Sequence, residues 1–412
     1  MTTIVPTSEE DPALSVVRRT SELSWADAGP EVMDEQVKRL FREAELCIVD
    51  GRWLDLTSLM LTSADMVFSS SKFSEKDLEC VFTVICNLVT KSENLDEVLE
   101  MTKLICAKVT QQPTDKPALR LKILFNLYNL LENAYCCFYV YMRALDLAVS
   151  GKVTELVVPS FKKIDSFLKE WNLGIKDQRL LFLTISNVLK ENKSSAKDSF
   201  KFLTKYLATF FGEDAHTLGE AKEEAVHTII EFVKASDIFQ CDLLDMPTIG
   251  QLEKDPKYAL VYQLLEIFLT HRLDAYLEFH AANSALLKSY GLVHEDCITK
   301  MRLMSLVDLA SNASGRIPYA VITDTLRIND DEVELWVVKA ITSKLIQCKM
   351  DQINQVVLVS FSIERVFGQR QWQALREKLA TWRGNILHVV NTIQANKITE
   401  DGSQAMQGLM IR

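Results

Sequence analysis

Glycine and proline are scarce in this chain, with 13 glycines and 9 prolines among 412 residues. Average proteins contain about twice that share of the two residues. Because tight turns and hairpins depend on them, a fold built mainly of sheets is disfavoured. The hydrophobic fraction of 48% and the charged fraction of 25% exclude a disordered or collagen-like chain. The sequence therefore predicts a mostly α-helical protein of two or three domains.

Motifs that mark catalytic and metal sites are also missing. None of the six histidines has a second histidine within four positions, which excludes the H-E-x-x-H and H-x-H zinc motifs. No P-loop, G-x-G-x-x-G or G-x-S-x-G pattern occurs. Ser-x-x-Lys occurs at Ser160 and at Ser194, but two such common residues meet this spacing by chance. We therefore expect no enzymatic activity, no metal site and no cofactor.

The sequence gives no sign of a membrane segment or of an oxidising compartment. The formal net charge of −10 disfavours binding of the whole chain to phosphates or anionic lipid. The nine cysteines include no C-x-x-C pair, which is typical of reduced thiols. The start of the chain has no apolar signal region, and apolar stretches end well before the roughly 20 residues of a membrane span. We expect a cytosolic or nuclear protein that does not enter membranes.

Most of the chain has the apolar periodicity of consecutive helices. Residues 1–30 are rich in Ser, Thr, Pro and acidic residues and are predicted to be a flexible tail. Over 31–290, apolar residues recur every three or four positions in segments of roughly 12 to 18 residues. Short links between such helices are typical of an α-solenoid, in which each helix pair buries its apolar face by stacking on the next. No sequence consensus repeats, so only the structure is expected to repeat.

The pattern changes after Gly291 to one typical of a winged helix, which we expect over 291–367. The acidic cap Asn329–Glu332 favours the start of a helix at Val333. Short apolar arms on either side of a polar turn predict a hairpin at the end of this region. The expected order is a helix at 296–313, an extended piece at 315–318, helices at 319–326 and 333–346, and hairpin arms at 345–350 and 356–363.

Two faces of the winged part are predicted from this pattern. In the helix that begins at Val333, we expect Leu335, Val338 and Ile341 or Thr342 to face inward. The second hairpin arm is an apolar strand that the edge of a partner's sheet could extend. Its residues Val356, Leu358 and Ser360 are therefore candidates for contact with a neighbouring wing; an intramolecular core is the alternative.

The last helix, expected over 368–394, has a heptad repeat. Its apolar residues follow one another at alternating spacings of three and four, which is the a/d pattern of a coiled coil. Such a seam needs a helical partner, and the helix is too long for a small winged domain to cover. We expect a bundle with other chains; packing on the same chain stays an alternative, and 395–412 is predicted to be a flexible tail. The seam residues are Trp372, Leu375, Leu379, Trp382, Ile386, Val389 and Ile393.

The charge distribution disfavours direct nucleic-acid binding by the winged part. The candidate recognition helix, 330–346, carries two lysines against four acidic residues, and the turn 351–355 has one acid and no base. The helix 368–394 is instead basic, with four basic residues against one acid. Its Arg376 and Arg383 could contact an acidic partner or RNA, or they could simply be solvated.

Several motifs resemble those of the PCI-domain family, whose members occur in the proteasome lid, the COP9 signalosome and translation initiation factor three. The resemblance covers about 35–394, is strongest in the winged part, and favours the initiation-factor branch. It rests on Pro117–Tyr128, Phe167-Leu-Lys-Glu-Trp-Asn-Leu173, Gly291-Leu-Val-His-Glu295, Lys300-Met-Arg-Leu303, Asp331–Leu335, Gln347–Gln352, Val356–Ser360 and Phe367–Gln373.

The resemblance implies a non-catalytic subunit whose winged helix lies beside those of other PCI-domain subunits and whose C-terminal helix joins a bundle. The expected function is that of a scaffold in translation initiation factor three, which supports the small-ribosomal-subunit pre-initiation complex and mRNA recruitment. The small ribosomal subunit would be met through the complex. The alternatives are a scaffold subunit of the signalosome or proteasome lid, and an RNA-binding adaptor.

Overall fold

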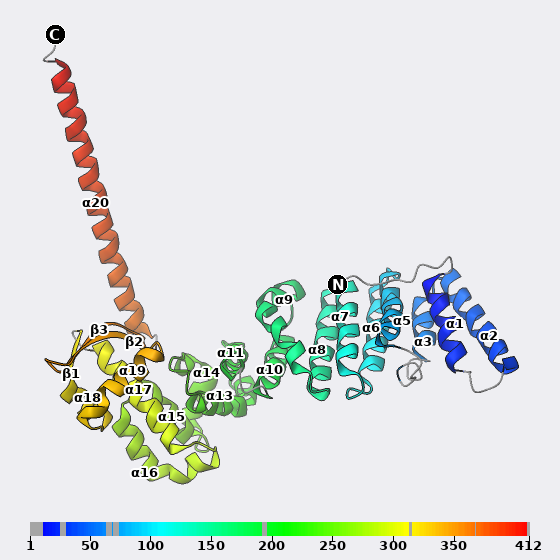
Figure 1. Ribbon diagram of the computed structural model, residues 1–412, viewed down its shortest axis with the longest axis horizontal. Helices are drawn as coiled ribbons and strands as arrows, with labels where there is room; N and C mark the ends of the chain where they lie inside the picture. The colour runs from blue at the N-terminus through cyan, green and yellow to red at the C-terminus, as the bar shows by residue number, and fades with distance from the viewer. Residues whose placement is uncertain are drawn as a thin grey trace. The chain divides into compact units, whose positions relative to one another are not determined.

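The computed structural model describes residues 11–24, 30–62, 68, 74–191, 196–312, 315–366 and 368–409 (Figure 1). It divides into two compact units, Met1–Thr209 and Phe210–Arg412. The described residues are mainly helical, with a small sheet in the second unit, as the composition predicts. The division lies inside the range 31–290 predicted to be one solenoid, and the other predicted domain boundaries stay predictions.

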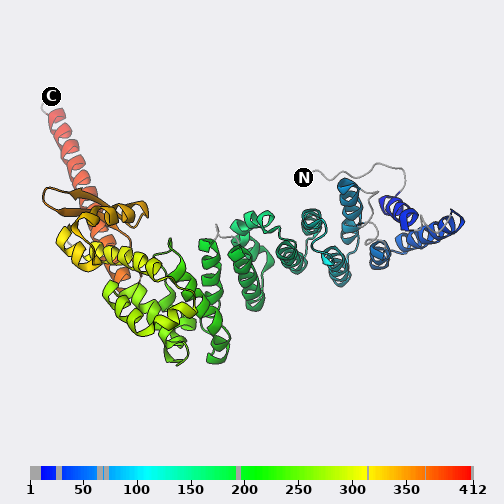
Figure 2. The same ribbon diagram turned by 60° about the horizontal axis from the view of Figure 1, so that its bottom comes forward.

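Unit 1 is a succession of helices that pack on their second neighbours along the chain. Helix α5 packs on α7, α6 on α8, and α8 on α10, while α7 and α10 pack on the helices that follow them (Figures 1 and 2). This is the stacking expected of an α-solenoid. The helices are α1 (Pro12–Ser24), α2 (Pro30–Val49), α3 (Trp53–Thr62), α5 (Glu75–Asn87), α6 (Leu95–Thr110), α7 (Pro117–Leu130), α8 (Ala134–Ser150), α9 (Ile164–Trp171), α10 (Ile175–Glu191) and α11 (Ala196–Ala208), with 3₁₀ turns η1 (Leu88–Thr90), η2 (Thr154–Leu156) and η3 (Val158–Lys163).

The predicted tail over 1–30 needs a correction. Pro12–Ser24 forms α1, which packs on α2. Ala13, Val16 and Val17 are buried, at the three- and four-residue spacing of one helix face. Burial of this short apolar stripe against α2 stabilises the helix. The prediction of a flexible tail was based on the polar composition of the residues around the stripe. Residues 1–10 and 25–29 lie outside the described residues.

A buried arginine joins α6 to the start of α7. Arg120 is only 2% exposed. Its Nη1 donates to the Val109 carbonyl oxygen at 2.8 Å, and its Nε donates to the Asp115 carbonyl oxygen at 2.7 Å. Nη2 completes the set with the Asp115 carboxylate at 3.2 Å, and the guanidinium lies 3.8 Å from the ring centroid of Phe68. The charge is therefore compensated at each of its three nitrogens.

The motif around Phe167 belongs to an aromatic cluster in the core of unit 1. The ring of Trp171 lies 5.3 Å from that of Phe167 and 5.2 Å from that of Tyr141, measured between centroids. Phe167 and Trp171 of the motif thus have a packing role. At the end of α8, Gly151 lies where a side chain would not fit, because an added Cβ would lie 2.7 Å from Pro117 Cβ.

Unit 2 begins with helices that surround a buried lysine on α17. Lys300 is 3% exposed, and its Nζ donates to the carbonyl oxygens of Phe232 and Ala235, the latter at 2.8 Å. Burial lowers the pKa of Lys300 to about 7. This lysine therefore ties α17 to the end of α13. The elements are α12 (Ala215–Glu220), α13 (Lys222–Lys234), η5 (Leu243–Asp245), α14 (Pro247–Gly250), η6 (Gln251–Lys254), α15 (Ala259–Thr270), α16 (Leu273–Ser289) and α17 (His294–Asn312).

The winged helix predicted after Gly291 is present. Its three-stranded antiparallel sheet has the order β1-β3-β2 and packs against α17, α18 and α19 (Figures 1 and 2). The short helix and the hairpin lie where the sequence predicts them. The elements after α17 are β1 (Arg316–Pro318), α18 (Tyr319–Leu326), η7 (Asp330–Glu332), α19 (Val333–Thr342), β2 (Ile346–Asp351) and β3 (Val356–Ser362).

The predicted inward face of α19 is wrong. Leu335, Val338 and Ile341 are 53%, 46% and 37% exposed, and Thr342 is exposed as well. The helix instead buries a second apolar stripe, which the sequence pattern did not distinguish from the first. The buried residues are Val333, Trp336, Val337 and Ala340.

The chain ends in one helix, α20 (Gln369–Leu409), of 41 residues. The predicted flexible tail over 395–412 is therefore corrected, because the backbone is helical to Leu409; residues 410–412 lie outside the described residues. At about 1.5 Å per residue, α20 is some 60 Å long.

Candidate partner-binding surfaces of the winged helix and α20

The strand order changes which residues form the free edge of the sheet. β3 is the central strand, and Val356 and Leu358 pair with both β1 and β2. The prediction that Val356, Leu358 and Ser360 form an edge is therefore wrong for the first two, since their backbone is already paired. All three lie on the face opposite the buried Val357.

Ser360 has a local structural role. Its Oγ donates to the Gln347 carbonyl oxygen at 2.9 Å, at a β-bulge where β3 has one extra residue, Ser360, between the partners of Gln347 and Cys348. Within the described residues, β2 pairs with β3 alone, so its outer side is free. The order also leaves β1 as an edge strand, but β1 has only three residues and ends at Pro318. The longer backbone that could accept a further strand is that of β2, Ile346–Asp351.

The turn of the hairpin is held by side-chain hydrogen bonds. Asn354 donates to the Asp351 carboxylate through its backbone nitrogen at 3.1 Å and through Nδ2 at 2.8 Å. The hydrogen bond from the Asn354 side chain lowers the pKa of Asp351. Ile353, at the tip, is 95% exposed. The turn is thus a fixed, acidic loop with one apolar side chain in solvent, as its lack of basic residues led us to expect.

The heptad seam of α20 is exposed along its length. Trp372, Leu379, Trp382 and Ile386 are 61%, 51%, 63% and 48% exposed, and Leu375 is 37% exposed. Val389 and Ile393 continue the same exposed row. In the part of the chain that the structure describes, the seam is therefore not covered intramolecularly. A contiguous exposed apolar surface of this kind marks an interaction site.

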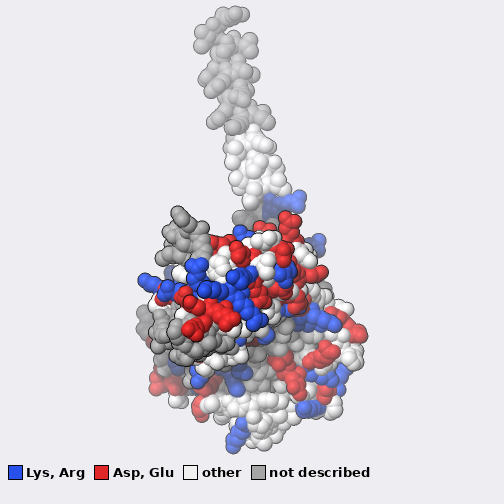
Figure 3. All heavy atoms as spheres, turned by 90° about the vertical axis from the view of Figure 1, so that its right-hand side faces the viewer, with Lys and Arg blue, Asp and Glu red and all other residues white. Residues whose placement is uncertain are grey.

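The basic residues of α20 flank this seam. Arg376 and Arg383 are exposed and directly follow the d-position residues Leu375 and Trp382, so both occupy e positions. Residues at e positions of a coiled coil meet charges on the partner helix. On the face shown in Figure 3, basic and acidic side chains are mixed, whereas the described part of α20 is mostly uncharged.

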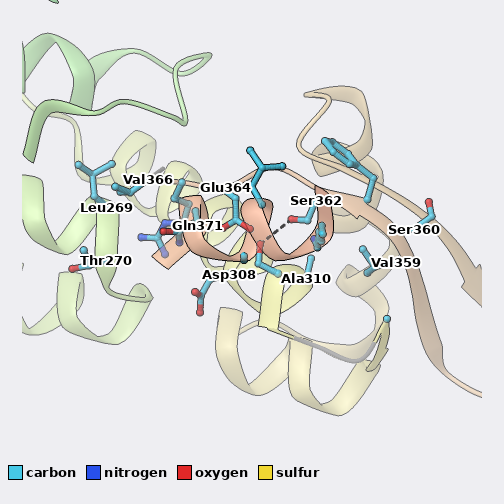
Figure 4. Close-up of a pocket in the computed structure, with 17 residues that line it drawn as sticks. Leu269, Thr270, Asp308, Ala310, Val359, Ser360, Ser362, Glu364, Val366 and Gln371 are labelled. Carbon is cyan, nitrogen blue, oxygen red and sulfur yellow. Dashed lines mark hydrogen bonds between the residues drawn. The ribbon is translucent and has the colours of Figure 1, made fainter. Parts of the chain in front are cut away.

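A pocket of about 880 Å³ lies at the start of α20 (Figure 4). Its walls come from the ends of α15 and α17, from β3, from 364–366 and from the first turns of α20. Arg365 lines it and is 6% exposed, and burial lowers the pKa of this guanidinium to about 10. Sequence reasoning missed both Arg365 and the pocket; the one signal was a basic residue two positions after the predicted strand 356–363.

Comparison with known proteins identifies both parts of this surface. Residues 277–361 match the PCI domain family, and residues 365–393 match the family described as eIF3 subunit M, C-terminal helix. "Eukaryotic translation initiation factor 3 subunit M" of Dictyostelium discoideum is 35% identical over 84% of this chain and 86% of its own length. The chain belongs to the subunit M family of eukaryotic translation initiation factor 3. The family members from Gallus gallus and Homo sapiens are 29% and 28% identical, each over 78% of this chain and 84% of their own length.

Membership of the subunit M family confirms the PCI resemblance and the initiation-factor branch predicted from the sequence. The match to the family's C-terminal helix begins at Arg365 and ends at Ile393, the last residue of the predicted seam. Among the described residues, no group of three or more His, Cys, Asp or Glu side chains could hold a metal ion. The helices that the structure describes include none with the length and apolar character to cross a membrane.

Proposed function

We propose that this chain is a non-catalytic scaffold subunit of translation initiation factor 3, which acts in the cytoplasm and supports assembly of the small-ribosomal-subunit pre-initiation complex and mRNA recruitment. Its partners would be other PCI-domain subunits, and it would meet the ribosomal subunit through the complex. The observation that carries the proposal is the exposed heptad seam of α20, in the segment that matches the family's C-terminal helix.

Two surfaces would make the contacts. Trp372, Leu375, Leu379, Trp382 and Ile386 would enter a bundle of helices, with the two tryptophans as anchors because large aromatic side chains bury the most area. The free edge of β2 would pair with a neighbouring winged helix, while Val356, Leu358 and Ser360 would contribute through the face of the sheet rather than its edge.

Affinity purification of the tagged chain from cell lysate, with and without 368–412, tests the proposal. Recovery of initiation-factor subunits and small ribosomal subunits with the full chain, and their loss on truncation, supports it. The isolated truncated chain should keep its melting temperature, because the seam is exposed in the described structure. Recovery of signalosome or proteasome-lid subunits, or no loss on truncation, would contradict it.

The basic e positions allow a second function to be tested in the same preparations. If Arg376 and Arg383 bound RNA, their reversal to glutamate would abolish an RNA affinity that falls steeply with salt. If they contact an acidic partner helix, as we propose, the reversal lowers recovery of the subunits instead and leaves RNA binding unchanged.

A further inference from the structure

The pocket at the start of α20 contains a buried guanidinium whose hydrogen-bond donors are only partly paired. Figure 4 shows Leu269 and Thr270 at one end of the pocket and Val359 and Ser360 at the other, with Gln371 between them. Arg365 is part of the lining and is almost completely buried. A guanidinium in such a place is stable only when acceptors surround it.

Only one of the three guanidinium nitrogens of Arg365 has hydrogen-bond acceptors among the described residues. Its Nη2 donates to the carbonyl oxygens of Phe268 at 2.6 Å and His271 at 2.7 Å, at the end of α15. Its Nε and Nη1 have no hydrogen-bond partner among the described residues. Asp308 acts on this charge, but its carboxylate is held by Arg272 at 2.7 Å. Arg365 is thus a partly unpaired donor at the wall of a pocket.

Other groups at the pocket add to its positive character. Lys378 of α20 lines it, and so do Gln371 and Leu375 from the first turns of that helix. The beginning of a helix is the positive end of its dipole. Glu364 and Asp308 also line the pocket, so the formal charges of its lining balance. What favours a group with acceptors and a partial negative charge is therefore the unpaired nitrogens of Arg365 and the positive end of the α20 dipole.

The end of a helix is such a group. Its last carbonyls have no partner within the helix and carry the negative end of the dipole. Arg365 already binds the last carbonyls of α15 in this way. The beginning of a helix would instead bring unpaired N–H donors and positive potential toward Arg365, Lys378 and the start of α20.

The pocket continues into the seam, because Leu375 belongs to both. A helix that packs along the seam therefore reaches the pocket with one of its ends. We propose that a helix of a partner subunit packs antiparallel to α20 and places its C-terminal end in this pocket, against Arg365 and Lys378. This inference rests on the proposed function, which supplies the partner helix but not its direction.

Photo-crosslinking in the assembled complex tests the direction. Trp372 and Trp382 are seam residues that lie ten positions apart on α20. Each is replaced in turn by the photo-crosslinking residue benzoylphenylalanine, which conserves an aromatic side chain. Mass spectrometry then locates the attached residues on the partner helix. Crosslinks from position 372 should lie nearer the C-terminus of that helix than those from position 382. The reverse order would overturn the inference and leave the scaffold function intact, whereas assembled complex with no partner crosslink from either position would contradict both.

A charge in the pocket tests the contact without removing Arg365, whose loss could unfold α15. Ala374 lines the pocket and is exposed, while Ala380 is exposed outside it, and neither belongs to the seam. A374E should lower the crosslink yield from position 372 at least fivefold, because it repels the end of the partner helix, and A380E should leave the yield within twofold. Equal yields for the two variants would refute the pocket contact.

Discussion

Replacing Leu379 and Ile386 by aspartate should separate binding from folding. Both residues are seam positions, and they are 51% and 48% exposed. Complete burial of such a side chain contributes about 1.5–3 kcal/mol, so roughly half of that remains to be gained at each position when a partner packs on α20. The two replacements would remove about 2 kcal/mol of binding free energy.

The new carboxylates add a desolvation cost of about 1–3 kcal/mol each if the partner buries them. The total loss is then at least about 4 kcal/mol, which corresponds to about a thousandfold in affinity. The isolated chain should unfold at nearly the same temperature, because exposed substitutions change stability by only about 0.5 kcal/mol each.

Competition for assembly measures this loss. The variant and the unmodified chain are co-expressed with different tags, and their ratio in the purified complex is compared with their ratio in the lysate. The control variant carries Thr381→Asp and His388→Asp, which have the same spacing on α20 but lie off the seam. Incorporation of the seam variant at the level of this control would refute the reasoning, and so would a large drop in its melting temperature, since the seam would then be part of the protein's own core.

Three further predictions concern stability, measured by chemical denaturation of the isolated chain. The free energy of unfolding should rise with pH between about 7 and 8.5, because the unfolded chain holds a proton on Lys300 that the folded chain releases above its pKa of about 7. Above about 8.5 the buried cysteines oppose this rise, because burial raises the pKa of their thiols and the unfolded chain then loses protons that the folded chain keeps. Lys300→Met should remove the rise, and an unchanged slope would contradict the prediction. Arg120→Met should lower the free energy of unfolding by about 1–3 kcal/mol, because the carbonyl oxygens of Val109 and Asp115 lose their donor, while the Asp115 carboxylate is 43% exposed and stays solvated. A loss well below about 1 kcal/mol would show that the site relaxes. Gly151→Ala should lower the free energy of unfolding by about 1–3 kcal/mol through overpacking, whereas a stabilised variant would mean that the neighbouring loop moves freely.

Elements that depend on local sequence could be predicted in unit 2. The short helix was expected at 319–326, and α18 spans Tyr319–Leu326. The hairpin arms agree with β2 and β3 to within one residue at each end, because a polar turn between two apolar stretches leaves few alternatives. The seam of α20 was likewise visible from its spacing alone, although what covers it was not.

Features that depend on how distant segments meet could not be predicted. β1 lies beside β3 only because the chain returns across the sheet, and this removes the edge expected at Val356 and Leu358. The face of α19 was misassigned because its two apolar stripes have the same periodicity, and only the packing of Trp336 against the rest of the domain selects one. Arg365 becomes a candidate site through the end of α15, which is almost a hundred residues away in sequence.

The exposed seam of α20 has a consequence for the lifetime of the chain in a cell. A molecule that carries a long apolar row before it meets its partners invites aggregation and capture by chaperones and proteases. Because these side chains do not belong to the core of unit 2, a stable fold gives no protection against that fate. The abundance of this subunit should therefore follow the supply of its partners, and molecules made in excess should be removed soon after synthesis.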